Sequence, residues 1–143
     1  MTPVKFAGQT RYLNYSMAVM MEVDTKYGGV DALLEILSDG KHSKEQFEAF
    51  AWAFVTMAND GEQKIAHDGY ESLPLLHESA LSQMMQPMTF SRLSEAMAEE
   101  ITVALNHEYT EEENEEIDLG LAELRKKKEK PAIAEERAIT LSD

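Results

Sequence analysis

The sequence predicts a mainly α-helical protein, with a compact helical domain of about five to seven helices. Two patterns favour this class. Apolar residues recur at three- and four-residue steps over most of the chain, which is the period of a helix and not of a strand. Glycine and proline interrupt these runs at intervals that leave segments of helical length. We expect a core domain at residues 1–109 that starts with a short β-hairpin, a loosely docked charged helix at residues 110–130, and a flexible tail at residues 131–143.

Length and charge restrict the class further. A chain of 143 residues is typical of one domain that folds without disulfides, and it contains no cysteine. Thirteen basic residues against 27 acidic ones give a net charge of −14. This surplus repels phosphates and anionic lipids, so we expect neither nucleic acid nor a membrane as partner. The first residues lack the order of a secretory leader and no long uncharged apolar run follows, so we expect a cytoplasmic location.

The first thirteen residues predict the hairpin. Val4 and Phe6 alternate with polar neighbours, as the residues of a half-buried strand do. Gly8-Gln9 supplies a turn, and residues 11–13 return as a second short strand. Two strands alone are marginally stable in water, so the hairpin is expected to lean on the helical body.

The segment from Leu13 to Leu37 predicts two helices that meet at a corner. The apolar stripe of the first consists of Leu13, Met17, Met20, Met21 and Tyr27. Gly28-Gly29 ends this helix, because glycine adopts the left-handed conformation without a Cβ penalty. The stripe of the second consists of Val30, Leu33, Leu34 and Leu37. A joint of two glycines is short enough to fold the pair into a corner, which the later helices are expected to cover.

The most apolar segment predicts the central helix. Ser43 and Gln46 match a capping box, in which the serine accepts from a first-turn amide and the glutamine side chain reaches back. The stripe that follows consists of Phe47, Phe50, Ala51, Phe54, Val55 and Ala58, with Trp52 and Met57 beside it. Asn59-Asp60-Gly61 is expected to end the helix. An aromatic row at this spacing favours a core over a ligand box, and we expect Phe50 and Phe54 to pack against the earlier helices. The expected contacts are Met17, Met20, Leu33 and Leu34.

Three shorter elements are predicted next. Residues 62–67 form a single helical turn, and residues 67–70 a loop. A helix follows Pro74 and ends at Pro87, which lacks the amide that continuation needs. Its apolar positions are Leu75, Leu76, Ala80, Leu81, Met84 and Met85. Thr89 or Ser91 caps the next helix, which ends near His107. The stripe of that helix consists of Phe90, Leu93, Met97, Ile101, Ala104 and Leu105.

Charge order predicts the last helix. Thr110 and Glu113 match a second capping box, and acids crowd the beginning of the segment while bases crowd its end, as the helix dipole favours. The apolar content is small, since only Ile117, Leu121 and Leu124 share a face. We interpret these three residues as a weakly docked face that exchanges with a binding partner. Pro131 ends the helix, and the residues beyond it lack periodicity and are expected to be disordered.

Residues suited to catalysis or metal binding are scattered. No two of the four histidines, His42, His67, His77 and His107, form a pair on one helix face, and there is no phosphate loop or nucleophile elbow. The acidic run at residues 111–116 lacks the alternating ligands and central glycine of a calcium loop. The basic run at residues 125–130 is interrupted by Glu129 and has no aromatic neighbours. We predict no enzyme activity, no catalytic residues, no metal and no cofactor.

Three segments together resemble one protein family. They read RYLNYSMAVMMEVDTKYGG at residues 11–29, FEAFAWAFVTMANDGE at residues 47–62 and ENEEIDLGLAELRKKK at residues 113–128. The first is similar to the opening, the second to the aromatic signature and the third to the C-terminal segment of tail assembly chaperones from long-tailed phages and prophages of Gram-positive bacteria. The middle of the chain, residues 70–86, carries none of the resemblance.

The resemblance implies a non-enzymatic assembly factor. Such chaperones bind the long helical tape-measure protein, recruit tail-tube subunits in the cytoplasm of the infected cell, and are absent from the finished virion. The composition is compatible with this, because an acidic surface keeps a chaperone soluble and nine methionines supply adaptable apolar surface. Whether the protein forms a homo-oligomer stays open.

Two other classes fit the same composition. A structural head–tail component would be found in purified particles. A small acidic regulator that covers a basic protein, for instance by imitating the charge of DNA, would spread its carboxylates as a continuous outer face instead of gathering them at helix starts.

Overall fold

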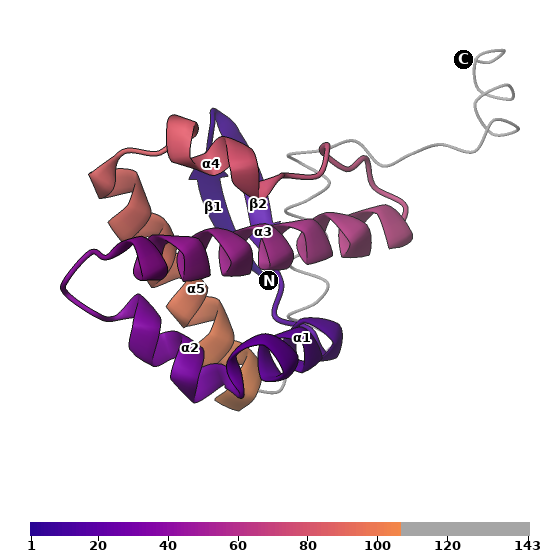
Figure 1. The fold of residues 1–143 in the computed structure, drawn as a ribbon. Helices are drawn as coiled ribbons and strands as arrows, with labels where there is room; N and C mark the ends of the chain where they lie inside the picture. The colour runs from indigo at the N-terminus through magenta and orange to yellow at the C-terminus, as the bar shows by residue number, and fades with distance from the viewer. Residues whose placement is uncertain (107–143) are drawn as a thin grey trace, which may run out of the picture.

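A β-hairpin and five helices make up residues 1–106, the part of the chain that the computed structural model describes (Figure 1). Their order is β1 (Thr2–Phe6), β2 (Gln9–Leu13), α1 (Met17–Tyr27), α2 (Val30–Leu37), α3 (Lys44–His67), α4 (Glu78–Met84) and α5 (Pro87–Asn106). The predicted mainly helical class with an N-terminal hairpin is confirmed. The predictions for residues 110–130 and 131–143 lie outside the described residues.

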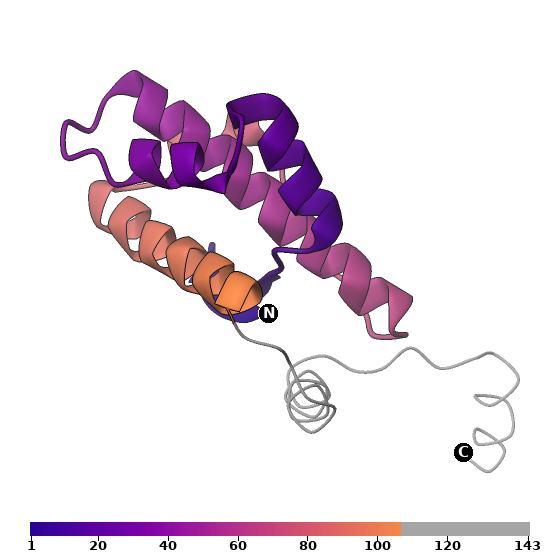
Figure 2. The ribbon, with the colours of Figure 1, turned by 90° about the horizontal axis from the view of Figure 1, so that it is seen from below.

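The longest helix, α3, is the centre of the fold, as predicted. It contacts β2, α1, α2, α4 and α5. In Figure 1 the α1–α2 pair lies along one flank of α3 and α4 along the opposite flank, and Figure 2 shows α5 running beside the hairpin. Phe50 and Phe54 of α3 are fully buried and stack with ring centroids 5.7 Å apart. Because large rings bury the most surface per residue, this stack anchors the core.

The hairpin has the tight turn that its twist requires. Ala7 and Gly8 both have positive φ angles, 54° and 78°, which matches a type I′ turn. The turn therefore lies one residue earlier than the Gly8-Gln9 turn that the sequence predicts, and Gln9 belongs to β2. The antiparallel register pairs Thr2 with Leu13, Val4 with Arg11 and Phe6 with Gln9. Phe6 meets Phe54 edge-on at 5.4 Å, so the hairpin leans on the helical body as expected.

The apolar stripe predicted for the first helix is confirmed only in part, since Met20 and Tyr27 pack against the core, whereas Leu13, Met17 and Met21 do not form a buried face of α1. α1 begins only at Met17, and Leu13 is a fully buried residue of β2. The buried residues of α1 are Val19 and Val23, whereas Met17 and Met21 are 68% and 61% exposed. Both sets of residues have a helical period, and α1 turns the one with Val19 and Val23 inward where it packs on α2 and α3. Met17 is therefore not the core contact of the phenylalanines that the sequence predicts.

The predicted corner between the first two helices is confirmed. Gly28 ends α1 with a left-handed φ of 85°, and its amide donates to the Asp24 carbonyl at 2.9 Å. α2 follows at Val30 and buries Leu33 completely. The ring of Tyr27, at the end of α1, meets Trp52 of α3 at 5.6 Å, which holds the corner on the central helix.

The predicted end of the central helix at residues 59–61 is wrong. α3 continues through these residues to His67 and includes the separate turn expected at residues 62–67. Asn59 uses its side chain for a tertiary contact, since Nδ2 donates to the Leu76 carbonyl at 3.1 Å and Oδ1 accepts from the Leu76 amide at 2.8 Å. Asparagine often ends a helix. Here the Asn59 side chain instead holds the segment that leads to α4.

The next two residues of that motif also contact other parts of the fold. Asp60 accepts a hydrogen bond from Asn14 Nδ2 at 2.8 Å. Gly61 lies against the backbone of Tyr12, where a side chain would not fit. The Asn-Asp-Gly sequence is thus explained by the docking of α3 on the hairpin and not by a turn.

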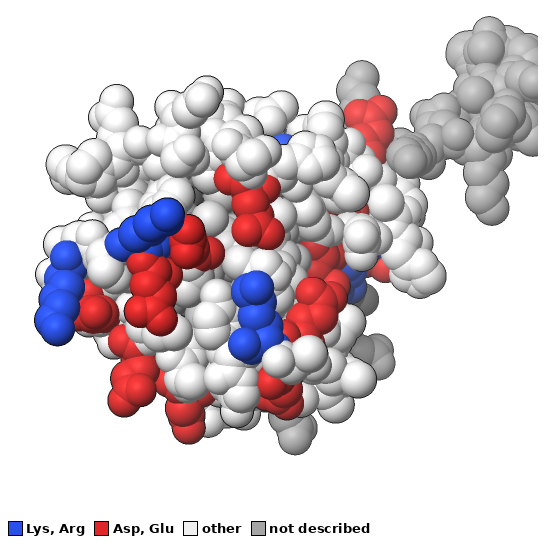
Figure 3. Space-filling view, in the orientation of Figure 1, with Lys and Arg blue, Asp and Glu red and all other residues white. Residues whose placement is uncertain are grey.

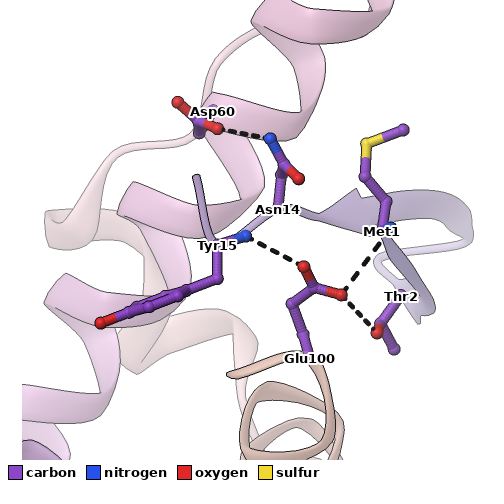
Figure 4. A network of polar contacts seen from close by, with 6 residues as sticks. All are labelled: Met1, Thr2, Asn14, Tyr15, Asp60 and Glu100. Atoms are coloured by element: carbon purple, nitrogen blue, oxygen red, sulfur yellow. Dashed lines mark hydrogen bonds and ion pairs between the residues drawn. The ribbon is translucent and has the colours of Figure 1, made fainter. Parts of the chain in front are cut away.

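A buried carboxylate joins the hairpin to α5 (Figure 4). Glu100 is 1% exposed, and its Oε2 accepts from the Tyr15 amide at 3.0 Å. Its Oε1 accepts from the Thr2 hydroxyl at 2.8 Å and lies 3.8 Å from the Met1 ammonium group. Several donors around one buried carboxylate offset the cost of removing its charge from water.

The start of α5 differs from the prediction. The sequence predicts that Pro87 ends one helix and that Thr89 or Ser91 caps the next, but Pro87 is the first residue of α5. Proline suits this position because its missing amide has no partner in the first turn of a helix. The buried residues Leu93, Met97 and Ile101 belong to the predicted stripe, which is confirmed, although Leu105 at its end is exposed.

Candidate functional site

An open, mostly apolar groove of about 720 Å³ lies where the start of α3 meets the junction between α4 and α5. The wall from α3 and the loop before it consists of His42, Ser43, Gln46 and Phe47. The wall from α4, α5 and their junction consists of Ser82, Met85, Gln86, Pro87, Met88, Phe90 and Ser91. An open groove with apolar walls suits a peptide or helix that lays side chains into it.

Gln46 fixes the loop that forms one wall. The Ser43 hydroxyl accepts from the Gln46 amide at 3.1 Å, so the first half of the predicted capping box is confirmed. The second half is wrong, because the glutamine side chain does not reach back to Ser43. Its Nε2 instead donates to the carbonyls of Ile36, Leu37 and Asp39. The carbonyls of Ile36 and Leu37 belong to the last turn of α2 and that of Asp39 to the loop that follows, so one side chain holds the end of α2 and the loop before α3.

Gln46 also carries a buried polar atom that has no partner in the described part of the chain. Its Oε1 is buried and has no hydrogen-bond partner within residues 1–106. The three carbonyl contacts of Nε2 fix the orientation of the amide.

The floor of the groove rests on the core. The Phe90 ring meets Phe50 edge-on at 4.8 Å and lies 6.3 Å from the rings of both Phe47 and His42. Phe50 in turn stacks on Phe54, so the aromatic row that the sequence assigns to the core continues to the surface through Phe47. The rings of the floor are supported from beneath by the fully buried Phe50 and Phe54.

One exposed methionine lines the edge of the groove and another lies next to it in the sequence, beside the lining residue Met85. Met88 is 85% exposed at the first turn of α5, and Met84 at the end of α4 is also exposed. Unbranched methionine side chains adapt their shape to different partners at little cost. The groove therefore combines an aromatic floor with an adaptable edge.

Some basic residues of this acidic domain are sequence neighbours of the lining residues. Residues 1–106 contain seven lysines and arginines against fifteen acids. Three of the seven adjoin lining residues: Lys41 and Lys44 flank His42 and Ser43, and Arg92 follows Ser91. Figure 3 shows basic side chains at the α2–α3 loop and the start of α3, with carboxylates over α1 and α2.

A second, shallower surface lies on α1 beside α3. It is lined by Ala18, Met21, Glu22, Thr25, Lys26 and Trp52. The Lys26 ammonium lies 5.5 Å from the centroid of the Trp52 ring, at the distance of a cation–π contact. Because this cation already covers the largest ring, less apolar surface is open here than in the groove.

Two tyrosines have perturbed ionisation. Burial, followed by the charge of Asp24, raises the pKa of Tyr15 above its ordinary value. Burial also raises the pKa of Tyr27, with smaller contributions from Glu78, Glu45 and Glu48. Neither hydroxyl lines the groove, so both shifts concern stability and not chemistry at this surface.

The residues singled out from the sequence are not brought together. Ile117, Leu121 and Leu124 lie outside the described residues. His42 lines the groove, His67 ends α3 and His77 precedes α4. Within residues 1–106, no group of three histidines or acids is placed to hold a metal ion. None of the helices in this range has the length and apolar content needed to cross a bilayer.

Sequence reasoning missed the groove. The apolar spacing assigns Met85 and Phe90 to buried helix faces, and Pro87 is read as the end of a helix. Proline is also favoured at the first position of a helix. A helix that starts at Pro87 would have put Met88 and Phe90 in its exposed first turn, next to the preceding helix.

Comparison with known proteins gives no match, whether to a protein family, to a curated protein or to a solved structure.

Proposed function

We propose that this protein is a tail assembly chaperone of a long-tailed phage or prophage, which binds helical segments of the tape-measure protein and recruits tail-tube subunits. The observation that carries the proposal is the open apolar groove between α3 and the α4–α5 junction, with an aromatic floor and exposed methionine at its edge. Grooves of this kind receive the apolar face of an amphipathic helix.

The chemistry of the rim supports a partner with repeated and varied helical segments. A tape-measure protein presents many similar helices rather than one unique epitope. Methionine-rich surfaces re-pack around different apolar side chains and therefore bind such sets of segments. Met85 and Met88 supply this surface at the groove.

The resemblance of three sequence segments supports the same proposal. Residues 11–29 form β2 and α1, and residues 47–62 form most of α3. Residues 113–128 lie outside the described residues. The proposal includes release of the chaperone before the tail is complete, so the protein acts in the cytoplasm and is not part of the virion.

Co-expression with the tape-measure protein of the same genome tests this proposal. The chaperone should raise the soluble yield of tape-measure fragments and co-purify with them. Met88→Glu places a charge on the groove rim and should abolish the effect, because a carboxylate is costly to bury against apolar side chains. Met21→Glu is the matched control, since Met21 is a similarly exposed methionine on the other surface.

Equal solubility of the tape-measure fragments with and without the protein would refute the proposal. If both Met88→Glu and Met21→Glu abolished the gain in soluble yield, the groove would not be the specific binding site. A stoichiometric amount of the protein in purified tails would favour the structural head–tail component instead.

One observation favours a second candidate, an acidic regulator of a basic protein. Fifteen acids against seven bases in residues 1–106 leave a surplus of eight, and Figure 3 shows carboxylates over α1, α2 and the start of α3. Such a regulator would bind through this face, so its affinity would fall steeply with salt and would be unaffected by Met88→Glu. A tape-measure complex that depends on Met88 distinguishes the two candidates.

A further inference from the structure

We infer that the surface between α1 and α3 is a binding site for an arginine side chain of a partner protein. The planar guanidinium group lies on the rings of Tyr27 and Trp52, and glutamates beside the rings accept its N–H groups. In the free protein the ammonium group of Lys26 takes this place. The inference involves neither the groove nor the tape-measure protein.

Two aromatic rings form the centre of the site. The rings of Tyr27, the last residue of α1, and Trp52 of α3 meet edge-on with their centroids 5.6 Å apart. Both side chains pack against the core but are only partly buried, and Trp52 lines the shallow surface on α1. Aromatic faces that solvent can reach attract cations, because the ring quadrupole makes each face negative.

The contact of Lys26 shows that this ring pair attracts a cation. Its ammonium group lies 5.8 Å from the ring centroid of Tyr27 and 5.5 Å from that of Trp52. Both distances are within the range of a cation–π contact. Within residues 1–106, Lys26 forms no ion pair, and its side chain is exposed. A cation that is held by exposed rings alone is held weakly enough for another cation to displace it.

Four glutamates lie around the two rings. Glu22 lines the surface on α1. The other three are Glu45 and Glu48 in α3 and Glu78 in the first turn of α4. Burial raises the pKa of Tyr27, and the charges of these three glutamates raise it further. Carboxylates from three helices are therefore close to the ring pair.

The glutamates have capacity for a further cation. Lys44 Nζ lies 3.9 Å from Glu48 Oε2, but both side chains are exposed, and such a pair contributes little. The other three glutamates form no ion pair within residues 1–106. The charge at this surface is therefore complementary to a basic side chain of a partner.

Arginine fits this site better than lysine does. A guanidinium group is planar, so it stacks on an aromatic ring while the N–H groups at its edge donate to carboxylates. An ammonium group is compact and strongly hydrated, and it has no plane to stack. An arginine of the partner therefore replaces the ammonium group of Lys26 on the rings.

The fluorescence of Trp52 tests the site directly, because this residue is the only tryptophan of the chain. The probe is a short peptide with capped ends in which glycine alternates with two arginines. The comparison peptides carry lysine or glutamine in place of arginine. At low salt the arginine peptide should change the fluorescence until saturation and bind at least about threefold more tightly than the lysine peptide. The glutamine peptide should have no effect.

A substitution at Lys26 tests the competition. Lys26→Met frees the rings and should tighten binding of the arginine peptide at least about threefold. Lys41→Met is the matched control, since it removes the same charge from an exposed lysine in the loop before α3, and it should change the affinity less than about twofold. Met88→Glu changes the groove and should leave this titration unchanged, so the proposed function and this inference fail independently.

Two results would overturn the inference. The absence of a saturable change in Trp52 fluorescence would mean that the arginine does not reach the rings. Equal affinities for the arginine and lysine peptides, or equal effects of Lys26→Met and Lys41→Met, would assign the attraction to the carboxylates alone.

Discussion

A Cβ atom at Gly61 would lie 1.8 Å from the carbonyl oxygen of Tyr12 and 2.9 Å from its carbonyl carbon. These two residues bring the last third of α3 into backbone contact with β2. The contact continues with the Asn14 amide, which donates to the Met57 carbonyl at 3.1 Å. The hairpin is thus seated on the central helix at the one point where α3 has no side chain in its way.

Gly61→Ala should destabilise the protein. In an ordinary helix this substitution stabilises by about 1 kcal/mol, because alanine has the higher helix propensity. Here the added methyl group would collide with backbone atoms that cannot rotate away, and we expect a net loss of about 1–3 kcal/mol. Urea denaturation followed by circular dichroism measures the change.

Gly40→Ala is the matched control, since nothing lies within 4 Å of a Cβ built at Gly40. That variant should keep the stability of the unchanged protein within about 0.5 kcal/mol. A stabilised Gly61→Ala variant would mean that β2 does not approach α3 this closely.

Gly61 also explains which parts of the fold could be predicted from the sequence. The class, the hairpin, the central helix and the α1–α2 corner follow from apolar period and from Gly28, because both act locally. The extent of α3 does not follow, since Asn59-Asp60-Gly61 is a turn signal when read alone. In the protein these residues contact Leu76, Asn14 and Tyr12, which are distant in sequence.

The candidate site was predicted less well for the same reason. A stripe at helical spacing identifies buried and exposed faces only when the neighbouring elements are known. Leu13 and Met17 share a helical period, yet the first belongs to β2 and the second is exposed. The groove arises from the meeting of three elements, and Pro87 is its only local signal.

The buried carboxylate of Glu100 should be important for stability. Glu100→Gln replaces one acceptor oxygen with an amide group, which faces donors from Tyr15 or Thr2 and cannot accept from them. We expect a loss of about 2–4 kcal/mol, because a buried hydrogen-bonded ion pair is broken. Chemical denaturation measures this loss.

Glu99→Gln, an exposed neighbour on the same helix, should change stability by less than about 0.5 kcal/mol. Equal effects in the two variants would contradict the network.

The aromatic core gives a third prediction. Phe54→Ala removes a fully buried ring that contacts Phe6 and Phe50, and should cost about 3–5 kcal/mol. Met17→Ala should cost less than about 0.5 kcal/mol, because Met17 is exposed and alanine is a good helix former. Thermal melts of the two variants compare these losses. A larger loss for Met17→Ala would restore the stripe that the sequence alone predicts for the first helix.

Tyr15 gives a prediction about alkaline stability. Its side chain is buried, and its hydroxyl has no hydrogen-bond partner within residues 1–106. Burial, together with Asp24, raises its pKa in the folded state above the value of about 10 that applies in the unfolded state. Below pH 10 both states hold the proton and the full stability is present. As the pH rises above 10 the unfolded state loses its proton first, so the free energy of unfolding decreases until the folded tyrosine also ionises.

Tyr15→Phe should remove this contribution. At pH 7 the variant should be nearly as stable as the unchanged protein, because the lost hydroxyl makes no hydrogen bond with residues 1–106 and the ring remains buried. Between pH 10 and 11.5 the variant should lose less stability than the unchanged protein, and the difference between the two should grow with pH. Urea denaturation at a series of pH values measures this difference.

Tyr27→Phe should have a similar effect, since the pKa of Tyr27 is raised as well. Parallel pH profiles for the Tyr15→Phe variant and the unchanged protein would mean that Tyr15 ionises in the folded state as readily as in the unfolded chain, which is incompatible with its burial.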